Sequence, residues 1–163
     1  MSDARKVLIV DDQIGDIGWA MDLLRHYGYL IDVATNEEAA CRRLEKVSRS
    51  ELSYSLAIFD IMVATRDMED LVEIDEQFLE ESRDTGVRLC QYVRTELQIP
   101  ASMLPIVCIS ARDDDSELRY TLRKLGIPLF SRTPQNTEES LRHYIDKHLA
   151  PAKPTSAPIE GER

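Results

Sequence analysis

The stretch that decides the fold is KVLIVDDQ, Lys6–Gln13. A short apolar run, Val7–Val10, leads directly into two acidic residues, Asp11 and Asp12. Such a run is typical of a strand that is buried on both faces of a parallel sheet. Two adjacent carboxylates repel each other and resist losing their water, so their arrangement costs free energy unless a cation binds them. The stretch therefore predicts a buried strand that ends at a cation site.

The rest of the chain continues an alternation of strands and helices. Apolar, β-branched runs predict further strands at 29–35, 54–60, 104–110 and 127–131. Apolar residues at helical spacing predict helices at 17–27, 36–47, 87–97, 116–125 and 138–149. This alternation indicates one α/β domain, a doubly wound parallel sheet with helices on both faces.

Several residues mark the expected helix ends. Thr35 and Glu38 have the spacing of a capping box at the start of the second helix. Asp113–Asp115 can cap the fourth helix, and Gly28 and Gly126 are expected stops.

In sheets of this kind, ligands bind beyond the carboxyl ends of the strands. Asp11 and Asp12 follow the first strand, Asp60 ends the third, Ser110 ends the fourth, and the fifth runs towards residues 132–134. Oxygen ligands select a hard cation, and a site that keeps several waters suits Mg²⁺. A carboxylate beside such a metal can attack a phosphoryl group and form an aspartyl phosphate. The sequence thus predicts phosphoryl chemistry at this edge.

Composition excludes several classes of function. The chain has 163 residues and a net charge of −10, which argues against nucleic acid or an anionic membrane as a partner. No apolar run reaches the roughly 18 to 20 residues of a membrane span, and we expect no signal peptide. Cys41, Cys90 and Cys108 form no CxxC pair, as expected for buried thiols in a reducing cytosol. We expect a cytoplasmic domain over 1–149 and a disordered, proline-rich tail over 150–163.

Four stretches, VLIVDDQ, LAIFDIM, LPIVCISA and GIPLFSRTP, resemble the signature stretches of the receiver domain of two-component response regulators. The resemblance covers about Lys6–Leu149, apart from one long interruption. It implies a flavodoxin-like sheet of strand order 2-1-3-4-5. It also implies a signalling module rather than an enzyme, which receives phosphate from a histidine kinase or phosphotransfer protein.

The resemblance assigns roles to individual residues. In the family, the second acidic residue of the first pair binds Mg²⁺ directly and the first acts mostly through water, which points to Asp12 and Asp11. The aspartate of the third strand, here Asp60, accepts the phosphoryl group, and the residue two positions later, here Met62, offers the metal its backbone carbonyl. Ser110 takes the place of the hydroxyl that contacts the phosphoryl group and moves on activation.

The fifth strand departs from the family pattern. The family carries a Lys–Pro pair there, whose ammonium contacts the phosphoryl group. Alignment on Pro134 puts Thr133 in the lysine's place, whereas counting from Ser110 brings Arg132 close to it, and both residues stay candidates. Arginine is a planar fork and does not reproduce the geometry of a compact ammonium. Phe130 matches the aromatic residue that moves together with the hydroxyl.

A second departure is an acidic insertion over about 63–85. Asp60 and Gly86 are 26 positions apart, where such loops usually have about 2 to 6 residues. The insertion holds nine acidic residues and two arginines, and apolar residues recur in it at helical spacing: Met68, Leu71, Val72, Phe78 and Leu79. Two interpretations remain open, a helical excursion packed on its own domain and a docking element for a downstream protein.

Three functions compete at this point. The first is a stand-alone receiver domain, phosphorylated on Asp60 with Mg²⁺, that signals through partner proteins. The second is a pseudo-receiver, a protein-interaction module that no longer uses phosphate; the missing lysine and the insertion favour it. The third is a phosphatase of the haloacid-dehalogenase type, but that class has an acidic residue where Met62 stands.

Overall fold

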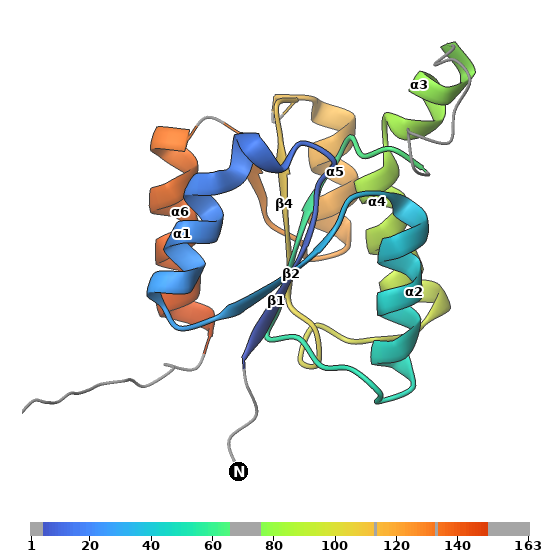
Figure 1. Cartoon of the computed structure of the whole chain (residues 1–163). Coiled ribbons are helices and arrows are strands. Elements are labelled where there is room, and N and C mark those ends of the chain that lie inside the picture. Colours follow the sequence, from blue (N-terminus) through green and yellow to red (C-terminus); the bar gives the residue numbers. More distant parts are fainter. Residues whose placement is uncertain (1–4, 66–75, 113, 133, 150–163) are drawn as a thin grey trace, which may run out of the picture.

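The computed structural model describes residues 5–65, 76–112, 114–132 and 134–149, with the backbone alone for 134–136. Five parallel strands form one sheet in the order β2-β1-β3-β4-β5 (Figure 1). The strands are β1 (Lys6–Val10), β2 (Leu30–Ala34), β3 (Leu56–Asp60), β4 (Ile106–Ser110) and β5 (Leu129–Ser131). The predicted fold class and strand order are therefore confirmed.

Helical segments connect the strands. They are η1 (Ile14–Ile17), α1 (Gly18–His26), α2 (Glu37–Ser48), α3 (Glu76–Ser82), α4 (Thr85–Gln91), the π-helical turn η3 (Tyr92–Glu96), α5 (Ser116–Lys124) and α6 (Pro134–His148). Helices α1 and α6 cover one face of the sheet, and α2, α4 and α5 cover the other (Figure 1). Each face has its own buried apolar cluster, because the central strands β1, β3 and β4 present apolar side chains to both sides.

Strand register places the predicted site. Val10 lies opposite Phe59, so the next residues along the two strands, Asp11 and Asp60, reach the same edge of the sheet. Asp60 in turn lies opposite Ile109, one residue before Ser110. The carboxyl ends of β1, β3 and β4 therefore meet where the sequence predicted them to meet.

Most of the expected helix ends are confirmed. Gly28 and Gly126 have φ angles of 89° and 71°, which glycine adopts without strain, and the Asp115 side chain caps α5 by accepting from the backbone of Glu117 and Leu118. The capping box was wrong, however. Asn36 is the cap of α2, because its side chain accepts from the Ala39 backbone N–H at 2.8 Å.

Other boundaries differ from the sequence-based ones. Helix α4 starts two residues earlier than predicted and passes into the π-helical turn η3, which the spacing of apolar residues did not indicate. Helix α6 starts at Pro134, four residues before the predicted start, since proline suits the first turn of a helix. The predicted tail over 150–163 lies outside the described residues. No described helix is both long enough and apolar enough to cross a membrane.

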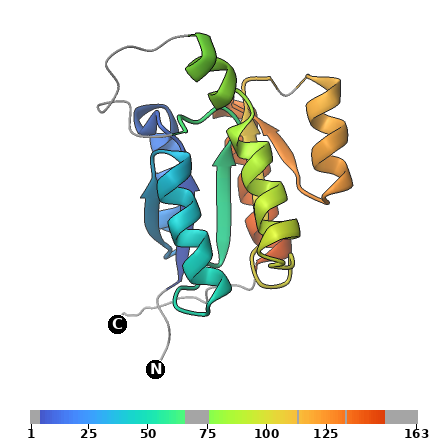
Figure 2. The ribbon, with the colours of Figure 1, turned by 90° about the vertical axis from the view of Figure 1, so that its right-hand side faces the viewer.

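The described part of the insertion contains a helix. Helix α3 stands beyond the carboxyl ends of the strands and leads into α4 (Figure 2). Its Phe78 and Ser82 side chains are buried, whereas Leu79 is exposed. The other apolar residues that recur at helical spacing in the insertion, Met68, Leu71 and Val72, lie outside the described residues. The exposed face of α3 is acidic apart from Gln77 and Leu79.

Candidate functional site

Three carboxylates meet at the carboxyl edge of β1 and β3. Asp11, Asp12 and Asp60 each offer one oxygen atom, and these atoms all lie within 4.8 Å of one another. Asp11 is buried, and Asp12 and Asp60 are partly buried. We call these three residues the acidic cluster. The sequence predicted all of its members.

A glycine of α4 packs on the backbone of Asp60 and Ile61. A Cβ atom on Gly86 would lie 2.4 Å from the Asp60 carbonyl oxygen and 2.7 Å from Ile61 Cα, both of them backbone atoms. The Gly86 N–H instead donates to the Ile61 carbonyl at 2.8 Å. Only glycine fits this approach, so Gly86 lets the start of α4 support the strand that carries Asp60. The sequence marked Gly86 only as a helix boundary.

Backbone N–H groups bind two of the carboxylates. Asp11 Oδ1 accepts from the Gln13 N–H at 2.7 Å, and Asp12 Oδ2 accepts from the Ala64 N–H at 2.8 Å. The second bond joins the first strand to the loop after β3. These contacts hold both carboxylates in fixed orientations.

Arg132 provides the cation of the cluster. Its Nη1 atom donates to Asp11 Oδ2 at 3.0 Å and forms an ion pair with Asp60 Oδ2 at 3.1 Å. Its Nη2 atom is buried, lies 3.8 Å from Asp16 Oδ2, and has no hydrogen-bond acceptor among the described residues. Of the two candidates for the lysine's place, Arg132 reaches the site, and Thr133 lies outside the described residues. The contribution of Asp16 was not predicted from the sequence.

The charges of the cluster shift one another's pKa values. Burial, and next the charge of Asp11, raise the pKa of Asp60 to about 7, although the Arg132 guanidinium opposes the shift. Burial also raises the pKa of Asp11 above its ordinary value, against the hydrogen bonds from Gln13 and Arg132. Burial opposes the charge of Arg132, but its bond to Asp11 and the charge of Asp60 raise its pKa overall. One guanidinium thus leaves the three carboxylates incompletely neutralised.

The donor set fits a hard divalent cation. Three ionised carboxylates beside one guanidinium leave a formal charge of −2, which is the charge that one Mg²⁺ ion balances. The oxygens are close enough to share one ion, and oxygen-only ligands suit Mg²⁺ or Ca²⁺. Met62 follows two residues after Asp60 with its side chain half exposed. Its role as a carbonyl ligand stays a prediction.

Two further predicted residues lie on neighbouring strands. Ser110 is buried at the end of β4, and its Oγ accepts from the Arg112 N–H at 2.8 Å. Phe130 on β5 is partly buried and packs edge-to-face on Tyr144 of α6, with ring centroids 6.3 Å apart. The movement expected of both on activation stays a prediction.

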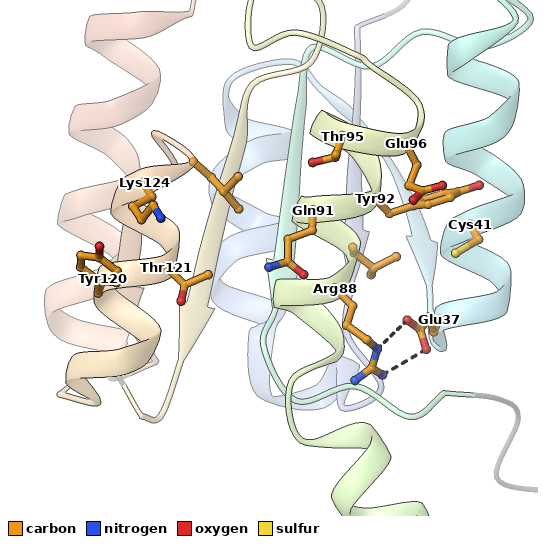
Figure 3. Close-up of a pocket in the computed structure, with 12 residues that line it drawn as sticks. Glu37, Cys41, Arg88, Gln91, Tyr92, Thr95, Glu96, Tyr120, Thr121 and Lys124 are labelled. Carbon is orange, nitrogen blue, oxygen red and sulfur yellow. Dashed lines mark hydrogen bonds and ion pairs between the residues drawn. The ribbon is translucent and has the colours of Figure 1, made fainter.

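A separate groove runs along α4 and η3. It has a volume of about 770 Å³ and lies over α2, α4, η3 and α5, and no residue of the acidic cluster lines it (Figure 3). Arg88 and Glu37 form a two-bonded ion pair at its rim, with both N–O distances 3.2 Å. Burial raises the pKa of two residues that line the groove, Cys41 to about 11 and Tyr92 to about 12. Among the described residues, however, the three carboxylates that converge closely enough to share an ion are those of the cluster.

Comparison with solved structures identifies the fold. A response regulator receiver domain protein from Methanospirillum hungatei shares 18% identity at a TM-score of 0.59, covering 89% of this chain and 96% of that one. The N-terminal domain of a response regulator from Carboxydothermus hydrogenoformans shares 24% identity at a TM-score of 0.58, covering 87% and 91%. The chain has the fold of response regulator receiver domains.

A third structure with the receiver fold contains ligands. This response regulator from Burkholderia pseudomallei, with 18% identity and a TM-score of 0.56, has a phosphorylated aspartic acid, a calcium ion and citrate. It covers 84% of this chain, which spans 64% of that one. No family model matches the sequence, and no curated protein is similar enough to count as a relative. The likeness to these proteins therefore rests on the fold.

Proposed function

We propose that the chain is a receiver module of two-component signalling that accepts a phosphoryl group on Asp60. The observation that carries the proposal is the meeting of Asp60 with Asp11, Asp12 and Arg132 at the carboxyl edge of a receiver fold. The phosphorylated aspartic acid of the Burkholderia structure supports this chemistry. The proposed module spans residues 1–149 and acts by signalling rather than by turning over a substrate.

The proposed reaction is a phosphoryl transfer. A carboxylate oxygen of Asp60 forms a bond to phosphorus while the bond from phosphorus to the donor breaks, and the donor leaves with that bond's electron pair. A bound Mg²⁺ ion supplies charge neutralisation of the phosphoryl oxygens. Asp12, Asp60 and the Met62 carbonyl would hold the ion, with Asp11 acting through water.

Two side chains of this chain serve the incoming phosphoryl group. Arg132 Nη2 is a buried donor without an acceptor among the described residues, so it can donate to a phosphoryl oxygen. Ser110 Oγ accepts one N–H, so its own hydrogen is available to a second phosphoryl oxygen. Arg132 then supplies the positive charge that the lysine supplies in the family, but through a planar guanidinium with two donor nitrogens.

The metal site is tested by thermal unfolding. Mg²⁺ should raise the melting temperature of the wild type, because a ligand that binds only the native state stabilises it. Asp12→Asn should abolish most of that increase. Equal responses of the two proteins to Mg²⁺ would contradict the assignment of Asp12.

A pseudo-receiver that uses no phosphate is the second candidate. The observation that favours it is Arg132 itself, which bridges Asp11 and Asp60 and gives the cluster a cation of its own. Mass spectrometry after incubation with acetyl phosphate and Mg²⁺ separates the candidates. A phospho-accepting receiver should show a stoichiometric phosphoryl adduct in the wild type and none in Asp60→Asn. A wild type without the adduct would favour the pseudo-receiver.

The proposed partners follow from the same reading. A histidine kinase or phosphotransfer protein would supply the phosphoryl group at the acidic edge. A downstream protein would read the state of the domain, with the insertion over 63–85 as its docking element. The exposed face of α3, with Leu79 among acidic side chains, supports that choice. A partner of this face would carry basic residues around an apolar contact.

A further inference from the structure

Arg112 joins two segments that are distant in the sequence. Its backbone N–H binds Ser110 Oγ at 2.8 Å in the loop between β4 and α5. Its guanidinium crosses to the end of the insertion, where Nη2 donates to Asp84 Oδ1 at 2.6 Å and to the Arg83 carbonyl at 3.3 Å. Nη1 contacts Asp115 at 3.5 Å, and Asp115 also caps α5.

The partners of Arg112 lie at the junction of α3 and α4. Thr85 follows Asp84 and donates from Oγ1 to the Val63 carbonyl at 2.6 Å, and Gly86 rests on the backbone of Asp60 and Ile61. The junction is therefore packed directly on the loop that follows the proposed phosphoryl acceptor. Through Arg112, the same junction is tied to the loop that begins at Ser110.

The ion pair between Arg112 and Asp84 replaces a helix cap. Asp84 stands at the N-cap of α4, where an aspartate side chain usually accepts a backbone N–H of the first turn. Within the described part of the chain, it makes no such bond, and its carboxylate binds the Arg112 guanidinium instead. The side chain of a cap residue thus serves a contact across the molecule.

We infer that Arg112 is a positioning residue that fixes the Ser110 hydroxyl and couples it to the α3–α4 junction of the insertion. The Arg112 N–H donates to one lone pair of Ser110 Oγ. The hydroxyl hydrogen and the second lone pair of Ser110 must then point away from this N–H. A displacement of Ser110 moves the backbone of Arg112, and the guanidinium carries that displacement to Asp84. The coupling exists without phosphate; its use on phosphorylation rests on the proposed function.

The first experiment needs no phosphate. Amide chemical shifts of Asp84–Gly86 are recorded for Ser110→Ala in the wild-type background and in an Arg112→Ala background. Ser110→Ala should shift these amides in the first background and leave them nearly unchanged in the second, which is the non-additivity expected of coupled residues. Arg112→Lys should restore part of the response, since a lysine can still reach Asp84.

Two variants make the comparison specific. Arg112→Ala and Asp84→Ala should each speed hydrogen exchange at Gly86 by about twofold to fivefold, the range for a partly exposed ion pair. Arg142→Ala, which breaks the Arg142–Glu138 pair on α6, is the matched control and should leave Gly86 exchange unchanged. If Ser110→Ala shifts Asp84–Gly86 equally in both backgrounds, or not at all in the wild type, Arg112 does not couple the two sites.

The second experiment uses beryllofluoride with Mg²⁺ as the phosphoryl mimic. Its binding should shift amides of α3 in the wild type and shift them about half as much or less in Arg112→Ala, while amides next to Asp60 respond in both. An unaltered α3 response in Arg112→Ala would overturn the coupling. If the mimic does not shift the amides near Asp60, the proposed function is contradicted. The coupling through Arg112 is then still decided by the first experiment, which uses no phosphate.

Discussion

The acidic cluster and the groove along α4 each contain an arginine bound to carboxylates. Arg132 is 17% exposed, and its partners Asp11 and Asp60 are 3% and 11% exposed. Arg88 is 41% exposed, and Glu37 is 22% exposed. The Arg88–Glu37 pair matches one cation with one anion, whereas the cluster sets one cation against three anions.

This difference separates a structural ion pair from a site that is prepared for another cation. In the groove, water screens the charges and the pair is neutral, so little free energy depends on it. In the cluster, burial strengthens every interaction and leaves negative charge uncompensated, which raises the pKa of Asp60. The same residue types therefore indicate function only where burial and charge imbalance coincide.

The largest effect is expected from Arg132→Met without divalent cations. Removing the guanidinium leaves buried carboxylates without a cationic partner, which should lower the free energy of unfolding by about 3 kcal/mol at pH 8. Mg²⁺ should recover more stability in the variant than in the wild type, because the ion takes over the missing charge. Urea unfolding with and without Mg²⁺ measures both. A loss below about 1 kcal/mol, typical of exposed pairs, would show that the cluster does not differ from the groove in this way.

Gly86→Ala tests the support that α4 gives to the cluster. The added Cβ would meet the Asp60 carbonyl oxygen at 2.4 Å, so the helix or the strand must move, and we expect a loss of about 2 kcal/mol in unfolding free energy. Gly18→Ala is the control, because no atom lies within 4 Å of its added Cβ. Mg²⁺ binding should also weaken in Gly86→Ala alone. Equal stability of the two variants would contradict the close approach.

The sequence predicted the acidic half of the site and missed much of what surrounds it. Asp11, Asp12 and Asp60 were predictable because strand ends in a parallel sheet share one edge. Arg132 was one of two candidates for the place of the lysine. Whether its long side chain reaches the carboxylates depends on the direction in which the chain leaves β5, and the sequence does not give that direction. Arg112 gave no signal, because its partner, Asp84, lies 28 residues away.

The helix boundaries were missed for a local reason. The capping box assigned to Thr35 and Glu38 gave way to Asn36, since Thr and Asn are both favoured N-cap residues and the turn geometry selects which of the two adjacent positions is the cap. The π-helical turn at Tyr92–Glu96 has no sequence periodicity of its own. The fold class can be predicted from the pattern of apolar residues, whereas the helix cap and the π-helical turn depend on local contacts that the pattern does not encode.

The acidic cluster and the groove should also differ in how they make stability depend on pH. The pKa of Asp60 is about 7 in the folded protein and 3.8 in the unfolded chain, so the folded state holds the proton more tightly. The contribution of Asp60 to stability should therefore fall as pH rises from 3.8 towards 7, by at most about 1.4 kcal/mol per pH unit in metal-free protein. Above pH 7, the fall should level off.

Asp60→Asn removes this dependence and is compared with the wild type by urea unfolding from pH 5 to 8 in the presence of a chelator. The advantage of the variant over the wild type should grow between pH 5 and 7. Glu37→Gln, in the groove, is the control and should show no such growth. A pH-independent difference between Asp60→Asn and the wild type would mean that Asp60 titrates at its ordinary pKa.

The smallest effect is expected from Arg88→Met, the counterpart of Arg132→Met. Arg88 binds Glu37 through two bonds of 3.2 Å and also donates to Thr85, but both charges reach water. The loss of unfolding free energy should be about 0.5 kcal/mol, and salt should reduce it further. Mg²⁺ should stabilise Arg88→Met and the wild type equally. A loss as large as that of Arg132→Met, or a change in Mg²⁺ response, would show that the groove and the cluster are energetically linked through α4, and that the acidic edge is not the separate functional centre proposed for it.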